Sequence, residues 1–221
     1  MAHFNELLPR RYPAPPELAY RGRSVHNADI SNFDPLGHPV VYRGHRSLIL
    51  EKAYTAAKNP DALVPRADGS GLVAFIDRIY SEPRAADVKR LGAPPYRGGL
   101  VQPRDDWNHV NIAAMDFFLR QRWQPGTADA AALAKRPRPI VEWVNWTDTR
   151  WGVRTDTCRG RNALGLLLDV IADELLDGLV LPGAGEADWR LRQEELIGLL
   201  NSRQAGFADG ARAPARQMSL F

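Results

Sequence analysis

The spacing of apolar residues predicts a mostly helical chain. In residues 47–59, Leu50, Tyr54 and Ala57 recur at helical spacing and would form one buried stripe. Ser47 can cap the start of this segment, and Pro60 prevents its continuation. Further helices are predicted at 71–81, 83–91, 106–123, 128–134, 164–175 and 186–203.

Few segments suit a β-strand. Residues 38–44 contain Val40, Val41 and Tyr42, which fit a pleated surface, and residues 139–144 are also strand-like. The pattern therefore predicts many helices and few strands. A length of 221 residues with 44% hydrophobic and 25% charged residues is ordinary for such a globular domain.

Composition excludes some functional classes. A net charge of +3 is too small to indicate nucleic-acid binding by itself. The single cysteine, Cys158, rules out an internal disulfide and a cysteine-cluster zinc site. Because the chain contains no apolar run of about 18 residues and no apolar signal-peptide core, we expect no membrane association and a cytoplasmic location.

The two ends differ in composition from the middle of the chain. Residues 1–24 are rich in proline and arginine, which favours an extended arm over a packed element. Residues 25–203 hold the predicted elements and form the expected catalytic domain. Residues 204–221 begin with small, polar residues and are expected to form a flexible tail.

The stretch 142–168 is the richest in chemistry. A strand-like run leads into a polar loop, which enters an amphipathic helix near Leu164. Helix N-termini attract anions, and arginines nearby supply donors for phosphate. The stretch therefore predicts a pocket for a phosphorylated ligand with a flat ring. Its loop carries Trp146, Asp148, Arg150, Trp151, Gly152, Arg154, Arg159, Gly160, Arg161 and Asn162.

Glu51 and Lys58 lie seven residues apart in the helix predicted at 47–59. Seven residues are close to two turns, so both side chains leave one face, about 10 Å apart along the axis. That separation does not suit a direct salt bridge, but both groups could line one pocket. By spacing alone, two solvent-exposed helix charges are the simpler interpretation.

Taken together, the motifs resemble the NADAR family, named for its proposed links to NAD and ADP-ribose metabolism. The resemblance runs from about Ser31 to Leu175. Its pieces are Ser31-Asn32-Phe33, the Glu51 and Lys58 pair, Asp106-Trp107 with Met115, and Asp148, Trp151-Gly152, Gly160, Asn162 and Leu164-Gly165. Four places depart from the family pattern, namely Leu50, Lys52-Ala53, the loop VRTDTCR after Gly152, and Asp169 with Ala172.

The resemblance implies an α+β fold, mostly helical, with a small β-sheet in a single domain, and cleavage of an N-glycosidic bond. We expect neither a cofactor nor a metal. We expect hydrolysis of the bond between ADP-ribose and a nucleobase, guanine, in nucleic acid, reversing its ADP-ribosylation. The alternatives are cleavage of a ribosylamino-pyrimidine phosphate of the riboflavin pathway and a non-catalytic module that binds ADP-ribose or nucleotide. The partners implied are ADP-ribosylated DNA or RNA, ADP-ribose, and a cognate ADP-ribosyltransferase toxin.

Breaking a ribose C1–N bond passes through an oxocarbenium-like state. A carboxylate such as Glu51 can stabilise that positive charge or activate the attacking water. Lys58 could protonate the leaving base, or attack C1 as a free amine to form a Schiff base. Asp148 is the third catalytic candidate, because it could bind the ribose hydroxyls or orient another group. The simpler interpretation is that its carboxylate forms hydrogen bonds within the loop. The substrate-binding candidates are Asn32, Phe33, Trp107, Trp151, Gly152, Arg154, Arg159, Gly160 and Asn162.

The last five residues, 217–221, resemble the short peptide by which bacterial replication and repair proteins bind the sliding clamp. Gln217, Leu220 and Phe221 occupy the positions that carry that resemblance. A motif of five residues also arises by chance. If the motif is used, we expect weak, micromolar-scale binding that tethers the enzyme to replicating DNA.

Overall fold

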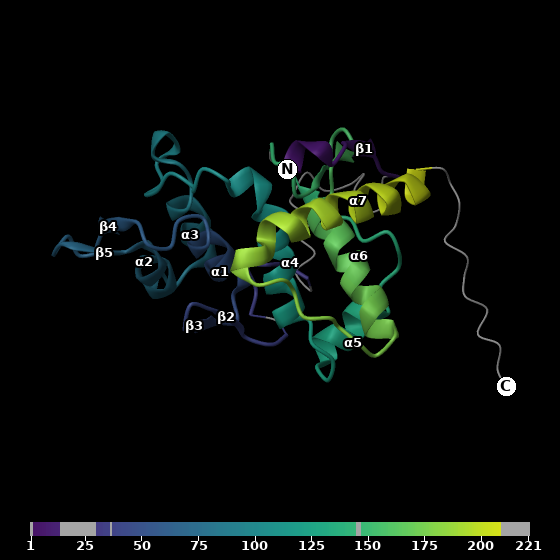
Figure 1. Ribbon diagram of the computed structural model, residues 1–221, viewed down its shortest axis with the longest axis horizontal. Coiled ribbons are helices and arrows are strands. Elements are labelled where there is room, and N and C mark those ends of the chain that lie inside the picture. Colours follow the sequence, from purple (N-terminus) through teal and green to yellow (C-terminus); the bar gives the residue numbers. More distant parts are fainter. Residues whose placement is uncertain (1, 14–29, 36, 145–146, 209–221) are drawn as a thin grey trace.

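The computed structural model describes residues 2–13, 30–35, 37–144 and 147–208. In this part of the chain the α-helices are α1 (Leu50–Ala56), α2 (Phe75–Ser81), α3 (Ala85–Leu91), α4 (Asn111–Arg122), α5 (Ala128–Ala134), α6 (Ala163–Leu176) and α7 (Trp189–Ala208) (Figure 1). Short 3-10 turns are η1 (Phe4–Glu6), η3 (Pro95–Arg97), η4 (Trp107–His109) and η5 (Glu186–Asp188). The expected α+β class with small sheets is confirmed.

The strands that the structure describes form three small sheets. One sheet contains four strands in the order β1 (Arg10–Arg11), β8 (Arg159–Gly160), β7 (Val153–Arg154) and β6 (Trp143–Val144). In this sheet β6 and β7 are parallel, and the other neighbouring pairs are antiparallel. Two hairpins are formed by β2 (Val40–Tyr42) with β3 (His45–Ser47), and by β4 (Leu63–Pro65) with β5 (Leu72–Ala74). The larger sheet thus joins the start of the chain to the loop at 147–162.

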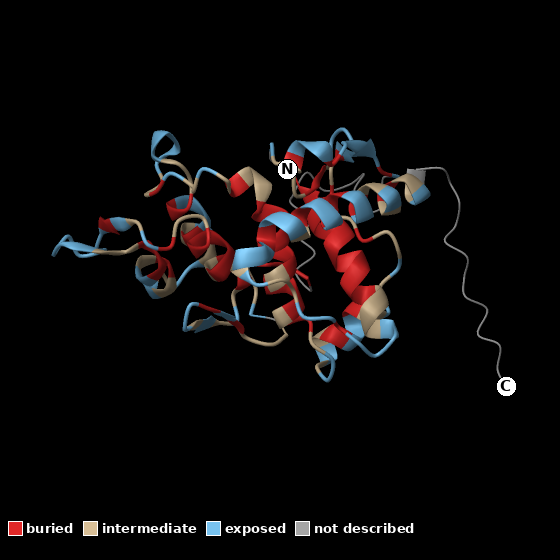
Figure 2. Cartoon of the chain, viewed as in Figure 1, coloured by how far each residue is buried: buried red, intermediate tan, exposed pale blue. Residues whose placement is uncertain are grey.

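One hydrophobic core connects most of the helices. α4 lies in its middle and contacts α1, α6 and α7, and both α4 and α6 are buried along most of their length (Figure 2). Trp123 at the end of α4 and Trp189 at the start of α7 are fully buried. This packing fixes α1 and the entry to α6, which carry the residues of interest.

The first residues of the chain are packed, so the extended arm predicted for 1–24 is wrong over residues 2–13. Phe4 and Leu7 are fully buried, and β1 pairs with β8. Asn201 of α7 donates to the carbonyl oxygen of Glu6 at 3.0 Å. Phe4 and Leu7 anchor this segment, and the average composition of residues 1–24, which is rich in proline and arginine, does not reveal them. Residues 14–24 lie outside the described residues.

Several predicted helix boundaries shift. Residues 72–74 form β5 before α2 begins, and Leu72 is 60% exposed, where the helical pattern had placed it inside. Ser47 lies in β3, and its hydroxyl accepts from the backbone of Ile49, so it does not cap α1. Asp106 does not cap α4 either, because its carboxylate binds Arg104 and Arg190. Tertiary contacts override these local preferences.

The C-terminal helix α7 runs further than predicted, to Ala208, so the tail does not begin at residue 204. Gln204 is buried, and its side chain donates to the hydroxyl oxygen of Tyr12 at 3.0 Å. The clamp-like residues Gln217, Leu220 and Phe221 lie outside the described residues. In the part that the structure describes, none of the helices combines the length and apolar character of a membrane span.

Candidate active site

A cavity of about 460 Å³ lies where α1, α3, α4, the start of α6 and the loop at 147–151 meet. α1 packs against both α3 and α4 (Figure 1). Ligand pockets in proteins commonly have this size. The predicted site residues that line the cavity are Asn32, Phe33, Glu51, Lys58, Trp107, Asp148 and Trp151.

Glu51 is buried, so the simpler interpretation of an exposed helix charge is wrong. Leu50 and Tyr54 anchor the same helix in the core, and the side chain of Glu51 is only 7% exposed. The hydroxyl of Thr55 donates to Oε1 of Glu51 at 3.2 Å. The backbone N–H of Glu51 donates to the carbonyl oxygen of Asn32 at 3.1 Å, which joins the 31–33 turn to α1.

Lys58 follows the last turn of α1 and is held at the cavity by α3 and the loop after it. Its Nζ donates to the carbonyl oxygen of Gly92 at 3.0 Å and lies 5.9 Å from the ring centre of Tyr54. A Cβ on Gly92 would lie 2.3 Å from Cγ2 of Thr55 and 3.2 Å from Nζ of Lys58. The close approach of this backbone to Lys58 therefore requires glycine at position 92.

The two groups perturb each other's titration in a buried setting. Burial raises the pKa of Glu51, and the charges of Lys89 and Lys58 partly oppose that rise. Burial lowers the pKa of Lys58, while Glu51 acts to raise it. Desolvation dominates in both cases, so each group can reach its neutral form more easily than in water. Opposite shifts in one cavity suit a proton donor and a proton acceptor.

Asp148 and Trp151 line the cavity from the loop side. Oδ1 of Asp148 accepts from the backbone N–H groups of Arg150 and Trp151 at 3.1 and 3.2 Å, so this carboxylate shapes the loop as well as facing the cavity. The ring of Trp151 packs edge-on against Tyr54 and Phe4, with ring centres 5.5 and 5.2 Å apart. Trp151 therefore belongs both to the core and to the cavity wall.

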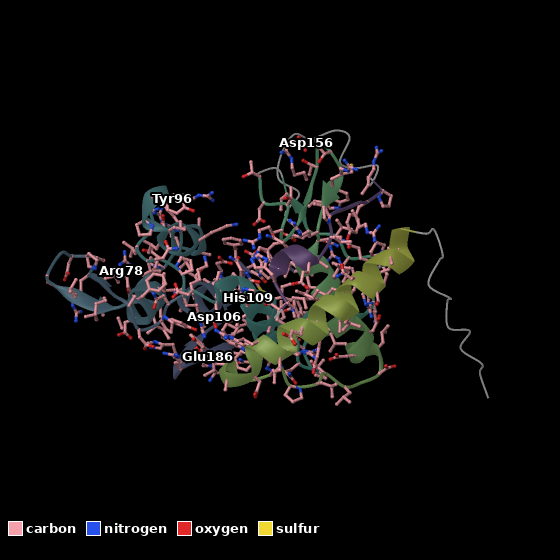
Figure 3. All side chains as sticks on the ribbon, turned by 45° about the horizontal axis from the view of Figure 1, so that its top comes forward. Arg78, Tyr96, Asp106, His109, Asp156 and Glu186 are labelled. Carbon is pink, nitrogen blue, oxygen red and sulfur yellow. The ribbon has the colours of Figure 1, made fainter. Side chains whose placement is uncertain are left out.

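The arginine that lines the cavity from this loop is Arg150, whereas Arg154 and Arg159 do not line it. Side chains alternate across a strand, so Val153 faces inward and Arg154 faces away. Arg154 pairs with Asp156, which lies at the outer end of the loop (Figure 3). Arg159 lies on β8 opposite Arg11. The prediction that Arg154 and Arg159 bind substrate is therefore not supported by their positions.

Gly152, Gly160 and Asn162 also lie outside the cavity lining, and their described contacts are structural. A Cβ on Gly152 would come within 2.6 Å of the carbonyl oxygen of Glu142, and one on Gly160 within 2.0 Å of that of Gly152. The amide of Asn162 bridges the backbone N–H of Glu142 and the carbonyl oxygen of Ile140. Gly152 and Asn162 thus pack the loop against residues 140–144, and Gly160 packs against Gly152 and Val153.

Other residues lining the cavity were not among the predicted site residues. Burial raises the pKa of Glu142 to about 7, with Asp148 adding to the shift and Lys89 opposing it. Glu142 stands at the start of the chemistry-rich stretch, but one glutamate beside a short strand carries no distinctive spacing. The missed lining residues that carry polar or charged groups are Ser31, Tyr54, Lys89, Arg97, Asn111, Glu142, Thr147 and Arg150.

Two amide side chains in the cavity wall have an acceptor without a partner in the described part of the chain. Oδ1 of Asn32 and Oδ1 of Asn111 are both buried in this way, and their residues are 6% and 2% exposed. The amide nitrogen of Asn32 contacts Sδ of Met115 at 3.6 Å. An unpaired buried acceptor costs about 1–3 kcal/mol, which a ligand carrying N–H groups can recover.

The lining is rich in charge of both signs. Four cations, Lys58, Lys89, Arg97 and Arg150, stand against three carboxylates, Glu51, Glu142 and Asp148. Burial raises the pKa of Glu51 and Glu142 and lowers the pKa of Lys58, so it disfavours charge of both signs in this cavity. Among the described residues, no group of three or more histidine, cysteine, aspartate or glutamate side chains could hold a metal ion.

The chain matches no family model, and no curated protein or solved structure is significantly similar to it. The functional argument therefore depends on the cavity itself and on the spaced motifs of the sequence.

Proposed function

We propose that this protein is an N-glycosidase that hydrolyses the bond between ADP-ribose and a nucleobase, guanine, in nucleic acid. The observation that carries the proposal is the meeting of Glu51 and Lys58 in one buried cavity walled by Trp107 and Trp151. Glu51 comes from α1, and Lys58 lies two residues beyond the end of that helix. The NADAR-like motifs, including Asp148, supply the reaction class.

The cavity offers complementary groups for each part of such a ligand. Arg97, Arg150 and Lys89 supply donors and positive charge for a diphosphate. Trp107 and Trp151 line the cavity, and aromatic rings of this kind can stack on a base. The cavity volume of about 460 Å³ suits one nucleotide-sized ligand.

In the hydrolytic route, the C1–N bond breaks and its electron pair stays on the base nitrogen. The ammonium of Lys58 gives a proton to the leaving base. Glu51, as a carboxylate, faces the positive charge that develops at C1 and takes a proton from the attacking water as the new C1–O bond forms. The raised pKa of Glu51 makes it a better proton acceptor than an ordinary surface glutamate.

In the covalent route, the neutral amine of Lys58 attacks C1 and the base leaves with a proton. Opening of the ribose ring, with a proton moving to the ring oxygen, then gives an imine that water hydrolyses. The lowered pKa of Lys58 favours the neutral amine that this route needs. Borohydride separates the two routes, because it reduces only an imine to a stable adduct.

Recognition of the base is assigned to the buried amides. Guanine carries a ring N–H and an exocyclic amino group, both donors, and Oδ1 of Asn32 and Oδ1 of Asn111 are acceptors without described partners. A ligand that donates a hydrogen bond to each unpaired oxygen binds more tightly, because the cost of burying that oxygen without a partner is removed. A base lacking those donors would leave both oxygens unpaired.

The test is incubation of the protein with an oligonucleotide ADP-ribosylated on guanine, followed by mass spectrometry. We expect release of ADP-ribose and of the unmodified oligonucleotide, and no release with Glu51→Gln. A parallel reaction contains the ribosylamino-pyrimidine phosphate. Cleavage of that compound alone would select the riboflavin-pathway alternative, and binding of ADP-ribose without any cleavage would select the non-catalytic module.

A further inference from the structure

The turn at the edge of the cavity, Pro95–Arg97, presents an aromatic side chain to solvent. Tyr96 is 77% exposed, the highest value among the large hydrophobic side chains that the structure describes. In Figure 3 it lies at the outer end of its loop. The next residue, Arg97, lines the cavity, and its guanidinium carbon lies 5.5 Å from the centre of the Tyr96 ring.

The backbone of this turn is held in one conformation. Pro94 and Pro95 restrict φ at two consecutive positions, and Gly98 adopts a φ of 78° that favours glycine. The N–H of Arg97 donates to the carbonyl oxygen of Pro94 at 2.8 Å, and the N–H of Leu100 donates to that of Leu91 at 2.8 Å. Tyr96 is therefore displayed on a preorganised turn, while it contributes little to the core.

We propose that Tyr96 and Arg97 form a contact surface for single-stranded nucleic acid, which receives the nucleotide next to the modified one. This inference rests on the proposed function and deepens it by naming the surface that holds the strand beside the modified nucleotide. A glycosidase that takes one nucleotide into a cavity removes the stacking partner of its neighbour. An exposed tyrosine ring at the cavity edge replaces that partner, and single-strand binding proteins use aromatic rings in this manner.

The charge beside Tyr96 fits the same occupant. Arg97 has no acidic partner within ion-pair distance in the described part of the chain, and Lys89 lines the cavity one helix turn from the loop. The side chain of Arg90, at the end of α3, is 62% exposed. Cationic groups beside an aromatic ring are complementary to a phosphate backbone with unstacked bases.

The experiment measures fluorescence anisotropy of the full-length protein with a labelled, unmodified single strand of about 12 nucleotides, within the site sizes of known single-strand binders. DNA and RNA strands form separate arms. Tyr96→Ala should weaken strand binding by about 5-fold to 100-fold, the range for stacking one base. Tyr96→Phe keeps the ring and should bind like the wild type. Leu63→Ala removes an equally exposed side chain, 69% exposed, from the β4–β5 hairpin and serves as the matched control.

Binding of free ADP-ribose, measured by calorimetry, separates this surface from the cavity. Tyr96→Ala should leave that affinity unchanged. The inference is overturned if the wild type does not bind the strand, or if Tyr96→Ala binds it as well as the wild type does. It is also overturned if Leu63→Ala weakens strand binding as much as Tyr96→Ala, or if Tyr96→Ala weakens ADP-ribose binding in parallel. Because strand binding needs no cleavage, a failed glycosidase assay tests the proposed function and not this surface.

Discussion

The helix α1 and the loop at 147–162 both looked rich in function, but they contribute to the cavity in opposite ways. Glu51 of α1 brings a buried carboxylate to the cavity, and Lys58, two positions after this helix, brings a half-buried amine. The loop carries the conspicuous arginines and glycines, and most of these hold the loop together. A stretch rich in arginine and glycine therefore indicates a structured loop as readily as it indicates a ligand-binding site.

The largest expected effect is that of Glu51→Gln. The substitution keeps shape and the contact with Thr55 but removes the charge and the proton acceptor, so kcat/KM should fall by about 10²–10⁴. Folding should persist, because the buried carboxylate already has a raised pKa and a neutral amide avoids its desolvation. Activity within a few-fold of the wild type, in a variant with an unchanged circular dichroism spectrum, would remove Glu51 from the mechanism.

A comparable loss, about 10²-fold or more, is expected for Lys58→Met, which keeps the aliphatic stem and deletes the amine. Lys52→Met is the matched control on the same helix, because Nζ of Lys52 binds the carbonyl oxygen of Tyr80 and does not line the cavity. Borohydride trapping adds a second measurement. A trapped sugar on the wild type but not on Lys58→Met supports the covalent route, and similar activity of the two methionine variants would contradict the assignment.

A smaller effect is expected when the wall behind Lys58 is altered. Gly92→Ala places a methyl group against Thr55 and Nζ of Lys58, so it should cost about 1–3 kcal/mol of unfolding free energy by overpacking. Activity should fall along with stability. Gly185→Ala is the control, because a Cβ there meets no atom within 4 Å and its φ of −63° suits alanine. Chemical denaturation of both variants checks this, and equal stability would contradict the close packing at Gly92.

The pH dependence of stability should carry a contribution from Glu142. Its folded pKa of about 7 lies above the ordinary value of 4.5, so the folded protein binds the proton more tightly. That contribution is fully present below about pH 4.5 and is lost as the pH rises through about 7. Over that window the unfolding free energy of the wild type should fall by about 1–3 kcal/mol relative to Glu142→Gln. Parallel urea titrations of the two proteins measure the difference, and curves that stay parallel across the window would contradict it.

The smallest effect should come from the loop. Arg154→Ala removes an exposed side chain whose described partner is Asp156, so kcat/KM should stay within about 2-fold of the wild type. Arg150→Ala is the informative partner variant, because Arg150 lines the cavity from the same loop. A larger loss of kcat/KM in Arg154→Ala than in Arg150→Ala would contradict the assignment of the cavity contact to Arg150.

Local patterns predicted most of the helices, because these depend on neighbours within two turns. Glu51 and Lys58 line one cavity as expected, but Lys58 lies two residues beyond the end of α1 and not on the predicted helix face. The β4–β5 hairpin escaped prediction, since strands of three residues show too little alternation to detect. Lys89, Arg97 and Glu142 also escaped, because only the folding of α3 and β6 around α1 brings them to the cavity. Arg154 was misassigned for a related reason, as its direction is set by pairing of β7 that the sequence does not display.

The packing of residues 2–13 has a consequence for the order in which the chain folds. β1 pairs with residues 159–160, and Leu8 and the carbonyl of Glu6 bind Asn201 in the last helix. These contacts span most of the chain, so the segment leaves the ribosome long before its partners exist. Contacts of such sequence separation form slowly. Phe4, which contacts Arg150 and Trp151 at the cavity wall, can therefore pack in place only after those residues have been synthesised.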